Sequence, residues 1–378
     1  MIDTAQQNQT DELPEFKRRD AYADWQQAEG VPVIKDYVFD DLMAIEVGPW
    51  PRKGGKGAVI NIPNPNLPND AHLVEIPPGG QSEPESHLYE EMVFIVSGRG
   101  STSVWFDESA KQTFEWGPGS LFAIPLNTTY QIYNGSGLEP IRYLSVTNLP
   151  PMLRLFQNQD FIFKNPFQFR DRFTGEKGFF SGEGKLYKGR KWEAAFIPDA
   201  ANMKLYGWKE RGAGGVNAML ELPQTHLAAH ISQFPVGTYK KAHRHGPGAH
   251  LVLTSGTGFS LLWKEGEEPL KADWHKNSMV IVPWEDTFHQ HFNAGAEPAR
   301  YLALRGGGAG GNRQYRDGAL ADLSIKLGGW QVEYEDEDPK IHQIFESELA
   351  KHGATCKMKH FIPWCTGEYG PTTIDQKD

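Results

Sequence analysis

Short runs of apolar residues recur along the middle of the chain, and each run ends near glycine, proline or another turn residue. In the first half these runs are Phe94-Ile95-Val96, Ser101 to Phe106, Ser120 to Ile124 and Tyr143 to Val146. Runs of this length and spacing are typical of strands in small barrels or jelly rolls. The pattern therefore predicts an all-β protein.

The same pattern returns later in the chain at a constant distance. Ala71-His72 recurs as Ala229-His230, 158 positions further on, and the same shift relates glycines, tryptophans and prolines of the two copies. The second copy repeats the strands as His250 to Thr254, Phe259 to Trp263, Met279 to Val282 and Tyr301 to Leu304. This constant shift of 158 residues between matching positions indicates duplication of one domain.

Two segments outside the repeats have the spacing of amphipathic helices. Asp20 to Glu29 and Lys340 to Lys351 carry apolar residues three and four positions apart, and an acidic, proline-containing segment precedes the second. We expect both helices to flank the barrels. The predicted organisation is an N-terminal extension with a helix (1–55), a first barrel (56–150), a linker and extension (151–215), a second barrel (216–310) and a C-terminal extension with a helix (311–378).

Charge and composition narrow the range of functions. The 38 basic and 48 acidic residues give a formal charge of −10, and no run of five Lys or Arg is present, so we expect no nucleic-acid partner.

The first 17 residues contain no signal or anchor, and no apolar run could span a bilayer, which predicts a cytoplasmic protein without a membrane partner. Cys356 and Cys365 match neither a paired-cysteine zinc motif nor a redox motif, and a disulfide between them is not needed.

The residues that could carry chemistry concentrate in the second copy. Gly237 is followed after five residues by His243-Arg244-His245, and Pro283 is followed by His289 and then by Asn293. These motifs resemble those of the cupins, whose barrel has one histidine-rich motif near a glycine turn and another after a proline. The resemblance covers residues 71–305 and implies two tandem cupin barrels, each a jelly roll or double-stranded β-helix, with flanking helices.

The spacing of the histidines suits metal binding. Alternate side chains of an extended strand share a face, so His243 and His245 can both point into the barrel, and His289 would approach from an opposing strand. Three neutral imidazoles leave coordination positions open on a first-row metal. We therefore expect a divalent metal at these three residues, in preference to the alternative that they are unconnected core or surface histidines.

A departure from the usual motif refines this expectation. Cupin sites often add a glutamate after the histidine pair, but the repeat register places Ala249 there, where the first copy has Glu91. His250 should face the other side of the strand, unless a bulge makes it a fourth ligand. Three histidines with this alanine resemble the gentisate, salicylate and hydroxynaphthoate ring-cleaving dioxygenases. Those bicupin enzymes usually carry their metal in the first barrel, whereas here it must lie in the second.

The first copy has Glu85, His87 and Tyr130 at the positions that match the three histidines. These residues and Glu91 could hold a cation weakly, but a tyrosine with a pKa near ten is a poor ligand at neutral pH. We expect this barrel to hold no metal and to have an architectural role.

The resemblance implies an Fe(II)-dependent dioxygenase that cleaves a hydroxylated aromatic acid or an enol-type small molecule, with that substrate and dioxygen as partners. His291 is a candidate acid or base beside the metal, or a packed residue, and Arg305, which has no counterpart in the first copy, is a candidate for binding a carboxylate. The alternatives are a bicupin decarboxylase or isomerase that uses Mn(II) or another divalent metal on a small organic acid, and a non-catalytic ligand-binding bicupin. Edge strands and the C-terminal helix are compatible with a homodimer.

Overall fold

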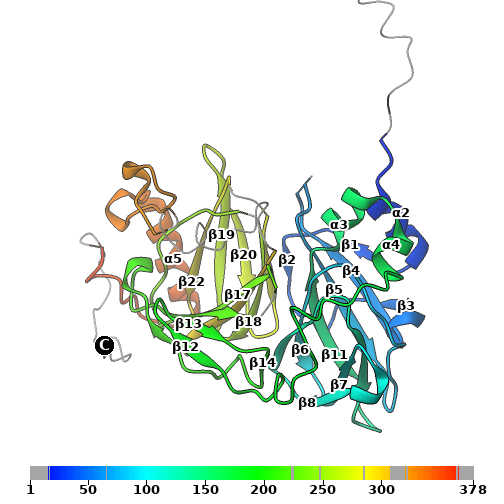
Figure 1. Cartoon of the computed structure of the whole chain (residues 1–378). Coiled ribbons are helices and arrows are strands. Elements are labelled where there is room, and N and C mark those ends of the chain that lie inside the picture. The colour runs from blue at the N-terminus through cyan, green and yellow to red at the C-terminus, as the bar shows by residue number, and fades with distance from the viewer. Residues whose placement is uncertain are drawn as a thin grey trace, which may run out of the picture.

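The computed structural model describes residues 16, 18–64, 66–222, 225–246, 248–283, 286–306, 320, 322–362 and 365. It consists of two β-barrels that lie side by side, with the first barrel on the right of Figure 1 and the second on the left. The prediction of an all-β protein with two jelly-roll barrels and flanking helices is confirmed. The limits of the five predicted segments remain predictions.

Each barrel contains eight main strands in the same order. The first comprises β4 (Gly55–Asn61), β5 (Asp70–Ile76), β6 (Glu91–Ser97), β7 (Gly100–Trp105), β8 (Gln112–Trp116), β9 (Leu121–Ile124), β10 (Thr129–Asn134) and β11 (Ile141–Thr147). The second comprises β16 (Val216–Glu221), β17 (Ala228–Phe234), β18 (Ala249–Ser255), β19 (Gly258–Lys264), β20 (Leu270–Trp274), β21 (Met279–Val282), β22 (Thr287–Asn293) and β23 (Ala299–Arg305).

The sheets of the two barrels have matching topologies. The large sheet of the first barrel has the order β4-β5-β11-β6-β9, and the small sheet has the order β10-β7-β8. In the second barrel the corresponding orders are β16-β17-β23-β18-β21 and β22-β19-β20. The duplicated sequence thus forms a duplicated set of strand pairings, and the predicted strands lie within them.

Short strands from the extensions complete the large sheets. In the N-terminal extension, β1 (Val33–Ile34) and β3 (Gly48–Trp50) pair with β4, whereas β2 (Val38–Phe39) pairs with β21 of the other barrel. In the linker, β14 (Phe196–Ile197) pairs with β9, and β12 (Lys185–Tyr187), β13 (Lys191–Glu193) and β15 (Tyr206–Gly207) extend the second barrel. These pairings cover strand edges that would otherwise be open to another chain.

The alternation of side chains along β18 assigns its two faces to different cores. Ala249 and Leu251 belong to a core cluster made of residues of the second barrel and of the Tyr37–Val38 segment. Val252, the next residue, belongs instead to the large cluster that also contains first-barrel residues. The strand is therefore buried on both sides, because one face lines the barrel and the other packs toward its neighbour.

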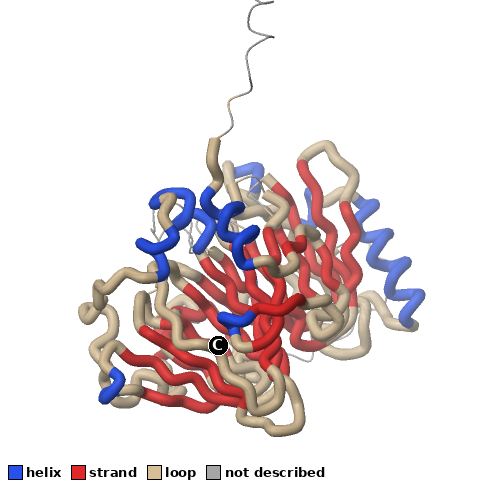
Figure 2. The backbone as a smooth tube through the Cα atoms, turned by 90° about the vertical axis from the view of Figure 1, so that its right-hand side faces the viewer, coloured by secondary structure: helices blue, strands red, loops and turns tan. Residues whose placement is uncertain are grey.

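Helices lie at the periphery of the barrels (Figure 2). The first predicted helix is α2 (Ala21–Glu29), which Asp20 caps by accepting a hydrogen bond from the Tyr22 amide. The predicted C-terminal helix is α5 (Pro339–His352), which begins after the capping residue Asp338. Both agree with the sequence to within a residue at each end.

Two helices in the linker were not predicted. They are α3 (Leu149–Phe156) and α4 (Gln159–Phe163). Helix α3 packs against α2, and α4 packs against α3. Pro150 and Pro151 obscure the start of α3 in the sequence, although prolines are tolerated in the first turn of a helix.

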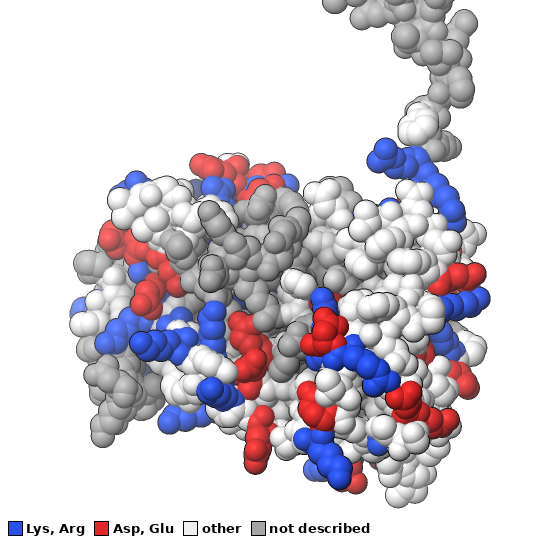
Figure 3. All heavy atoms as spheres, viewed as in Figure 1, with Lys and Arg blue, Asp and Glu red and all other residues white. Residues whose placement is uncertain are grey.

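Basic and acidic side chains are interspersed over the face drawn in Figure 3. None of the helices in the described part of the chain combines the length and apolar character needed to cross a membrane.

The pairing of β2 with β21 predicts a long-range stabilising contact. Phe39 is 7% exposed, so replacing it with alanine removes buried apolar surface between the N-terminal extension and the second barrel. We expect Phe39→Ala to lower the free energy of unfolding by about 3 kcal/mol, measured by urea denaturation. Val33→Ala, at a residue that is 46% exposed, is the control, and an equal effect of both changes would contradict the prediction.

Candidate metal centre

The three histidines of the second barrel meet near its interior. His243 lies before β18, and His289 lies on β22 opposite it, because the two residues exchange backbone hydrogen bonds of 3.1 and 2.8 Å. Their ring centroids are 4.1 Å apart, and the ring of His245 lies 4.8 Å from that of His289. One ligand atom from each histidine lies within 4.8 Å of the others. The structure therefore brings the three predicted ligands together.

The protonation of these histidines suits a cation. Burial, followed by the nearby Arg211 guanidinium, lowers the pKa of His243 well below its ordinary value and that of His289 to about 3. Burial and then His289 also lower the pKa of His245. All three rings are therefore neutral at pH 7, the form in which imidazole binds metals.

Several ring nitrogens have no protein partner. The Nδ1 atoms of His245 and His289 are buried without a hydrogen bond among the described residues. Nδ1 of His243 lies 3.2 Å from the Lys241 carbonyl oxygen and donates to it, which leaves Nε2 as the atom with a free lone pair. Since buried polar atoms rarely remain unpaired, the group fits a divalent metal ion.

Strand alternation separates Ala249 from His250 as the sequence predicts. Ala249 faces the barrel core, whereas the Nδ1 atom of His250 lies 3.3 Å from Asn69 Nδ2 of the first barrel. His250 is fully buried, and it is absent from the group of converging ligand atoms. The structure thus assigns it to the contact between the barrels rather than to a fourth ligand position.

His291 lies next to the three-histidine group but outside it. Its ring centroid is 5.5 Å from that of His289, and its Nδ1 atom is 2.8 Å from Ser260 Oγ. Ser260 Oγ also accepts a hydrogen bond from Trp274 Nε1, which fixes it in place. Burial, followed by His289, lowers the pKa of His291 well below its ordinary value. Its position suits a neutral proton acceptor beside the metal ligands, and its catalytic role stays a prediction.

Two buried arginines lie near the histidines. Arg305, at the end of β23, is 8% exposed and close enough to lower the pKa values of His245 and His289. Arg211 is 3% exposed and donates to Asp322 Oδ1 at 2.7 Å, while its Nε and Nη1 atoms have no partner among the described residues. The site therefore combines neutral imidazoles with buried positive charge.

Arg211 is a residue that the sequence analysis missed, although the repeat contains the signal. It lies in the short 3-10 helix Lys209–Arg211, which corresponds at the same 158-residue shift to Pro51–Lys53 of the first copy. Trp50 and Trp208 match in the same way. The duplication therefore begins before Ala71, and extending it would have paired Arg211 with Lys53.

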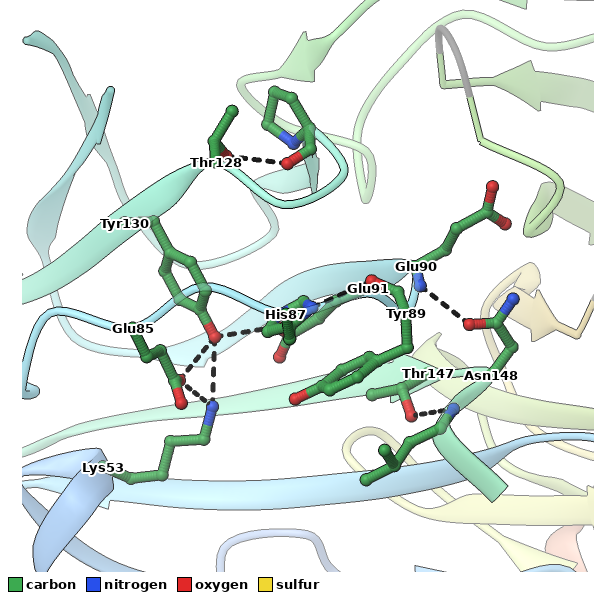
Figure 4. A network of polar contacts seen from close by, with 12 residues as sticks. Lys53, Glu85, His87, Tyr89, Glu90, Glu91, Thr128, Tyr130, Thr147 and Asn148 are labelled. Carbon is green, nitrogen blue, oxygen red and sulfur yellow. Dashed lines mark hydrogen bonds and ion pairs between the residues drawn. The ribbon is translucent and has the colours of Figure 1, made fainter. Parts of the chain in front are cut away.

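In the first barrel, Lys53 occupies the place where its polar side chains converge (Figure 4). Its ammonium group forms an ion pair with Glu85 and lies 3.1 Å from Tyr130 Oη. Tyr130 Oη lies 2.5 Å from Glu85 Oε1 and 2.9 Å from Glu91 Oε2, and Glu91 is 3.0 Å from His87 Nε2. A fixed side-chain cation thus pairs with a carboxylate of this cluster, and the architectural role of the barrel stays a prediction.

Strand pairing confirms that Tyr130 is the counterpart of His289. Glu85 forms a backbone bridge with Tyr130, as His243 does with His289. Tyr130 pairs with Val104, and His289 pairs with Leu262, the residue 158 positions after Val104. The shift between Tyr130 and His289 is one residue larger, because the second copy has an extra residue before β22.

Removal of one histidine should abolish tight metal binding in the second barrel. We expect His289→Ala to weaken Mn(II) binding by more than about 100-fold, because two imidazoles alone hold the ion poorly. The measurement is a titration of metal-free protein followed by electron paramagnetic resonance of free Mn(II). His250→Asn changes a histidine outside the group and should bind like the unmodified chain; equal affinities of the two variants would refute the site.

Lys53 should make stability depend on pH. Burial alone would raise the pKa values of Glu85 and Glu91, but Lys53 and His87, together with Arg52 in the case of Glu85, hold both below 4.5. Because these carboxyls have lower pKa values in the folded chain, they stabilise it above pH 4.5, and this contribution is lost as the pH falls.

We therefore expect Lys53→Met to lower the free energy of unfolding by about 3 kcal/mol at pH 7, because it leaves buried carboxylates without their cation. The deficit should shrink as the pH falls through 4.5, as measured by chemical denaturation across that range. Lys56→Met, at an exposed neighbour, should have little effect. A deficit that is independent of pH would contradict this electrostatic origin.

Comparison with known proteins supports the barrel assignment. Residues 72–147 match the model of the cupin domain, and no curated protein matches the chain. Similar solved structures include a variant of Bacillus subtilis oxalate decarboxylase, with 14% identity, a TM-score of 0.47 and coverage of 78% of this chain and 85% of that one. A Lactobacillus farciminis oxalate decarboxylase formate complex is similar with 13% identity, a TM-score of 0.47 and coverage of 72% of this chain and 86% of that one. Hazelnut vicilin from Corylus avellana is similar with 13% identity, a TM-score of 0.46 and coverage of 71% of this chain and 85% of that one. The residues that match the cupin-domain model lie within the first barrel, and the repeat relates the second barrel to it.

Proposed function

We propose that the chain is a metal-dependent enzyme that acts on a small organic acid in its second barrel. The observation that carries the proposal is a group of three neutral histidines near the buried Arg211, whose Nε and Nη1 atoms have no hydrogen-bond partner in the described part of the chain. The histidines supply a site for a divalent metal, and the guanidinium supplies donors for an anion. The metal would be Fe(II), with Mn(II) or another divalent ion as the alternative.

The cationic residues favour a substrate that carries a carboxylate. A buried guanidinium without its full set of hydrogen bonds is costly, and a carboxylate can accept two of its N–H groups in parallel. Arg305 adds a second positive charge near His245 and His289. In this proposal the two arginines orient the acid so that another of its oxygens faces the three histidines.

A metal bound here would polarise a substrate oxygen as a Lewis acid and, as Fe(II), would supply the redox chemistry needed to use dioxygen. The chain itself would position the acid, exclude water and move a proton. His291 is buried, neutral and adjacent to His289, so it is the proposed proton acceptor.

For the reaction, we favour oxygenation of a hydroxylated aromatic or enol-type acid. The three-histidine set with Ala249 inside the barrel resembles that of the ring-cleaving bicupin dioxygenases. Decarboxylation of a small organic acid is the second candidate. Both reactions require a bound carboxylate, so the buried positive charge of Arg211 and Arg305 favours decarboxylation as much as oxygenation. Oxalate decarboxylases are also among the proteins of similar fold.

Two simultaneous measurements separate these reactions. Metal-free protein is loaded with Fe(II) or Mn(II) and offered hydroxylated aromatic acids and small keto and dicarboxylic acids, while dioxygen uptake and carbon dioxide release are recorded. Uptake of dioxygen in proportion to substrate consumed supports oxygenation, whereas carbon dioxide release without net uptake supports decarboxylation. Failure of metal-loaded protein to act on or bind any of these acids would refute the proposed function, and His289→Ala is the inactive control.

Once a substrate is found, Arg211→Gln should weaken its binding. Losing a charged hydrogen-bond donor should raise KM about 10- to 100-fold, with a smaller change in kcat, measured by steady-state kinetics. Arg211→Lys keeps the charge and should recover part of the loss. Arg170→Gln, at a half-exposed arginine paired with Asp107, is the control. An unchanged KM in Arg211→Gln would contradict this role.

A further inference from the structure

A second group of metal-ligand atoms lies in the C-terminal extension, outside the barrel interior. His342 and Glu346 are one turn apart on α5, and Cys356 and Cys365 lie in the segment that follows the helix. One ligand atom from each of the four residues lies within 4.8 Å of the others. We refer to these four residues as the C-terminal cluster.

The distances within the cluster are close to those around a tetrahedral zinc ion. His342 Nε2 is 3.1 Å from Glu346 Oε1 and 4.0 Å from Cys356 Sγ, while Cys365 Sγ is 3.3 Å from Cys356 Sγ and 3.7 Å from Glu346 Oε1. Ligands bonded to zinc at ordinary lengths are separated by roughly 3.3 to 3.8 Å. Small side-chain movements would therefore place all four atoms at bonding distance from one ion.

The surroundings of His342 fix the tautomer that a metal requires. Tyr239 donates its only hydroxyl proton to Glu337 at 2.6 Å, so its oxygen can accept from His342 Nδ1, which lies 3.1 Å away. A proton on Nδ1 leaves the Nε2 lone pair directed at the cluster. Such a hydrogen bond to the second ring nitrogen accompanies most metal-bound histidines.

We propose that the C-terminal cluster is a structural zinc site. Two thiolates, an imidazole and a carboxylate form a borderline-soft donor set that suits zinc better than magnesium or calcium. Four protein ligands close the coordination sphere, which is the arrangement of a structural rather than a catalytic site. His342, Cys356 and Cys365 are at most 6% exposed and Glu346 is 33% exposed, so solvent would approach the ion only on the side of the carboxylate.

Bound zinc would fix α5 and the following segment against the second barrel. Phe345 on α5 packs on Phe292 of β22, and the cysteines belong to the same apolar cluster. Figure 1 shows α5 beside β22. The ion would add to the apolar contacts that this extension already makes with the second barrel.

Zinc analysis in a background without the three-histidine group tests this proposal. His289→Ala protein purified from zinc-containing medium should retain about one zinc ion per chain. Addition of Cys356→Ser and Cys365→Ser to that background should remove it. Thiol alkylation is a second readout that needs no substitution in the C-terminal cluster, because the chain has only these two cysteines. Both thiols should be protected from alkylation when zinc is bound and should react after the zinc is removed by a chelator.

Cobalt substitution identifies the ligands directly. Co(II) in the C-terminal cluster should show a thiolate-to-metal charge-transfer band, which the three-histidine group cannot produce because it contains no sulfur. The band should persist in His289→Ala and disappear when Cys356→Ser and Cys365→Ser are combined. Absence of both zinc and this band in reduced protein, or a stable Cys356–Cys365 disulfide in protein isolated without oxidant, would overturn the proposal. Neither result depends on the activity of the second barrel.

Discussion

The internal organisation of each barrel depends on one antiparallel backbone bridge that places two polar side chains face to face. In the first barrel the bridge joins Glu85 to Tyr130, and in the second it joins His243 to His289. Both pairs are buried, so each requires a partner that water cannot provide. Lys53 meets this requirement in the first barrel by pairing with Glu85. In the second barrel the corresponding cation is Arg211, which is held by Asp322. The lone pairs of its histidines therefore remain available to a metal.

Strand alternation determines which other residues reach these centres. One face of β18 presents Ala249 to the barrel interior, and the other presents His250 to Asn69 of the first barrel. A shift of one residue would exchange the alanine and the histidine and create a different ligand set. Burial on both faces opposes such a shift, because it would also move Leu251 and Val252 into the wrong cores. The packing of two barrels thus preserves the three-histidine composition of the centre.

The sequence predicts the parts of this arrangement that follow local periodicity and the repeat. It predicts β6, β7, β9 and β11 with their counterparts β18, β19, β21 and β23, the helices α2 and α5, the converging histidines and the separation of Ala249 from His250. It does not predict β2 and β14, because strands of two residues have no periodicity and are formed only by pairing with distant partners. The repeat that begins at Ala71 does not include Arg211, whereas its extension to Trp50 and Lys53 does. The C-terminal cluster was missed because its histidine and glutamate lie on a helix, and only tertiary packing brings them to the cysteines.

The C-terminal extension also bears on the geometry of the candidate metal centre. His243 and its neighbours do not belong to a regular strand, although their backbone bonds to β22 on one side. From outside, Arg244 and Ala242 bond to the backbone of Trp330 and Val332, and Gln331 forms a bridge with His243. On the opposite side of the bridge, Gln290 donates to Glu337 at 2.6 Å, and Glu337 also accepts from Tyr239, the neighbour of His342. The segment around His243 and the strand β22 that carries His289 are therefore both bonded to the extension. Since metal ligands are positioned by the groups that support them, the extension acts as part of the centre's scaffold even though it contributes no ligand to it.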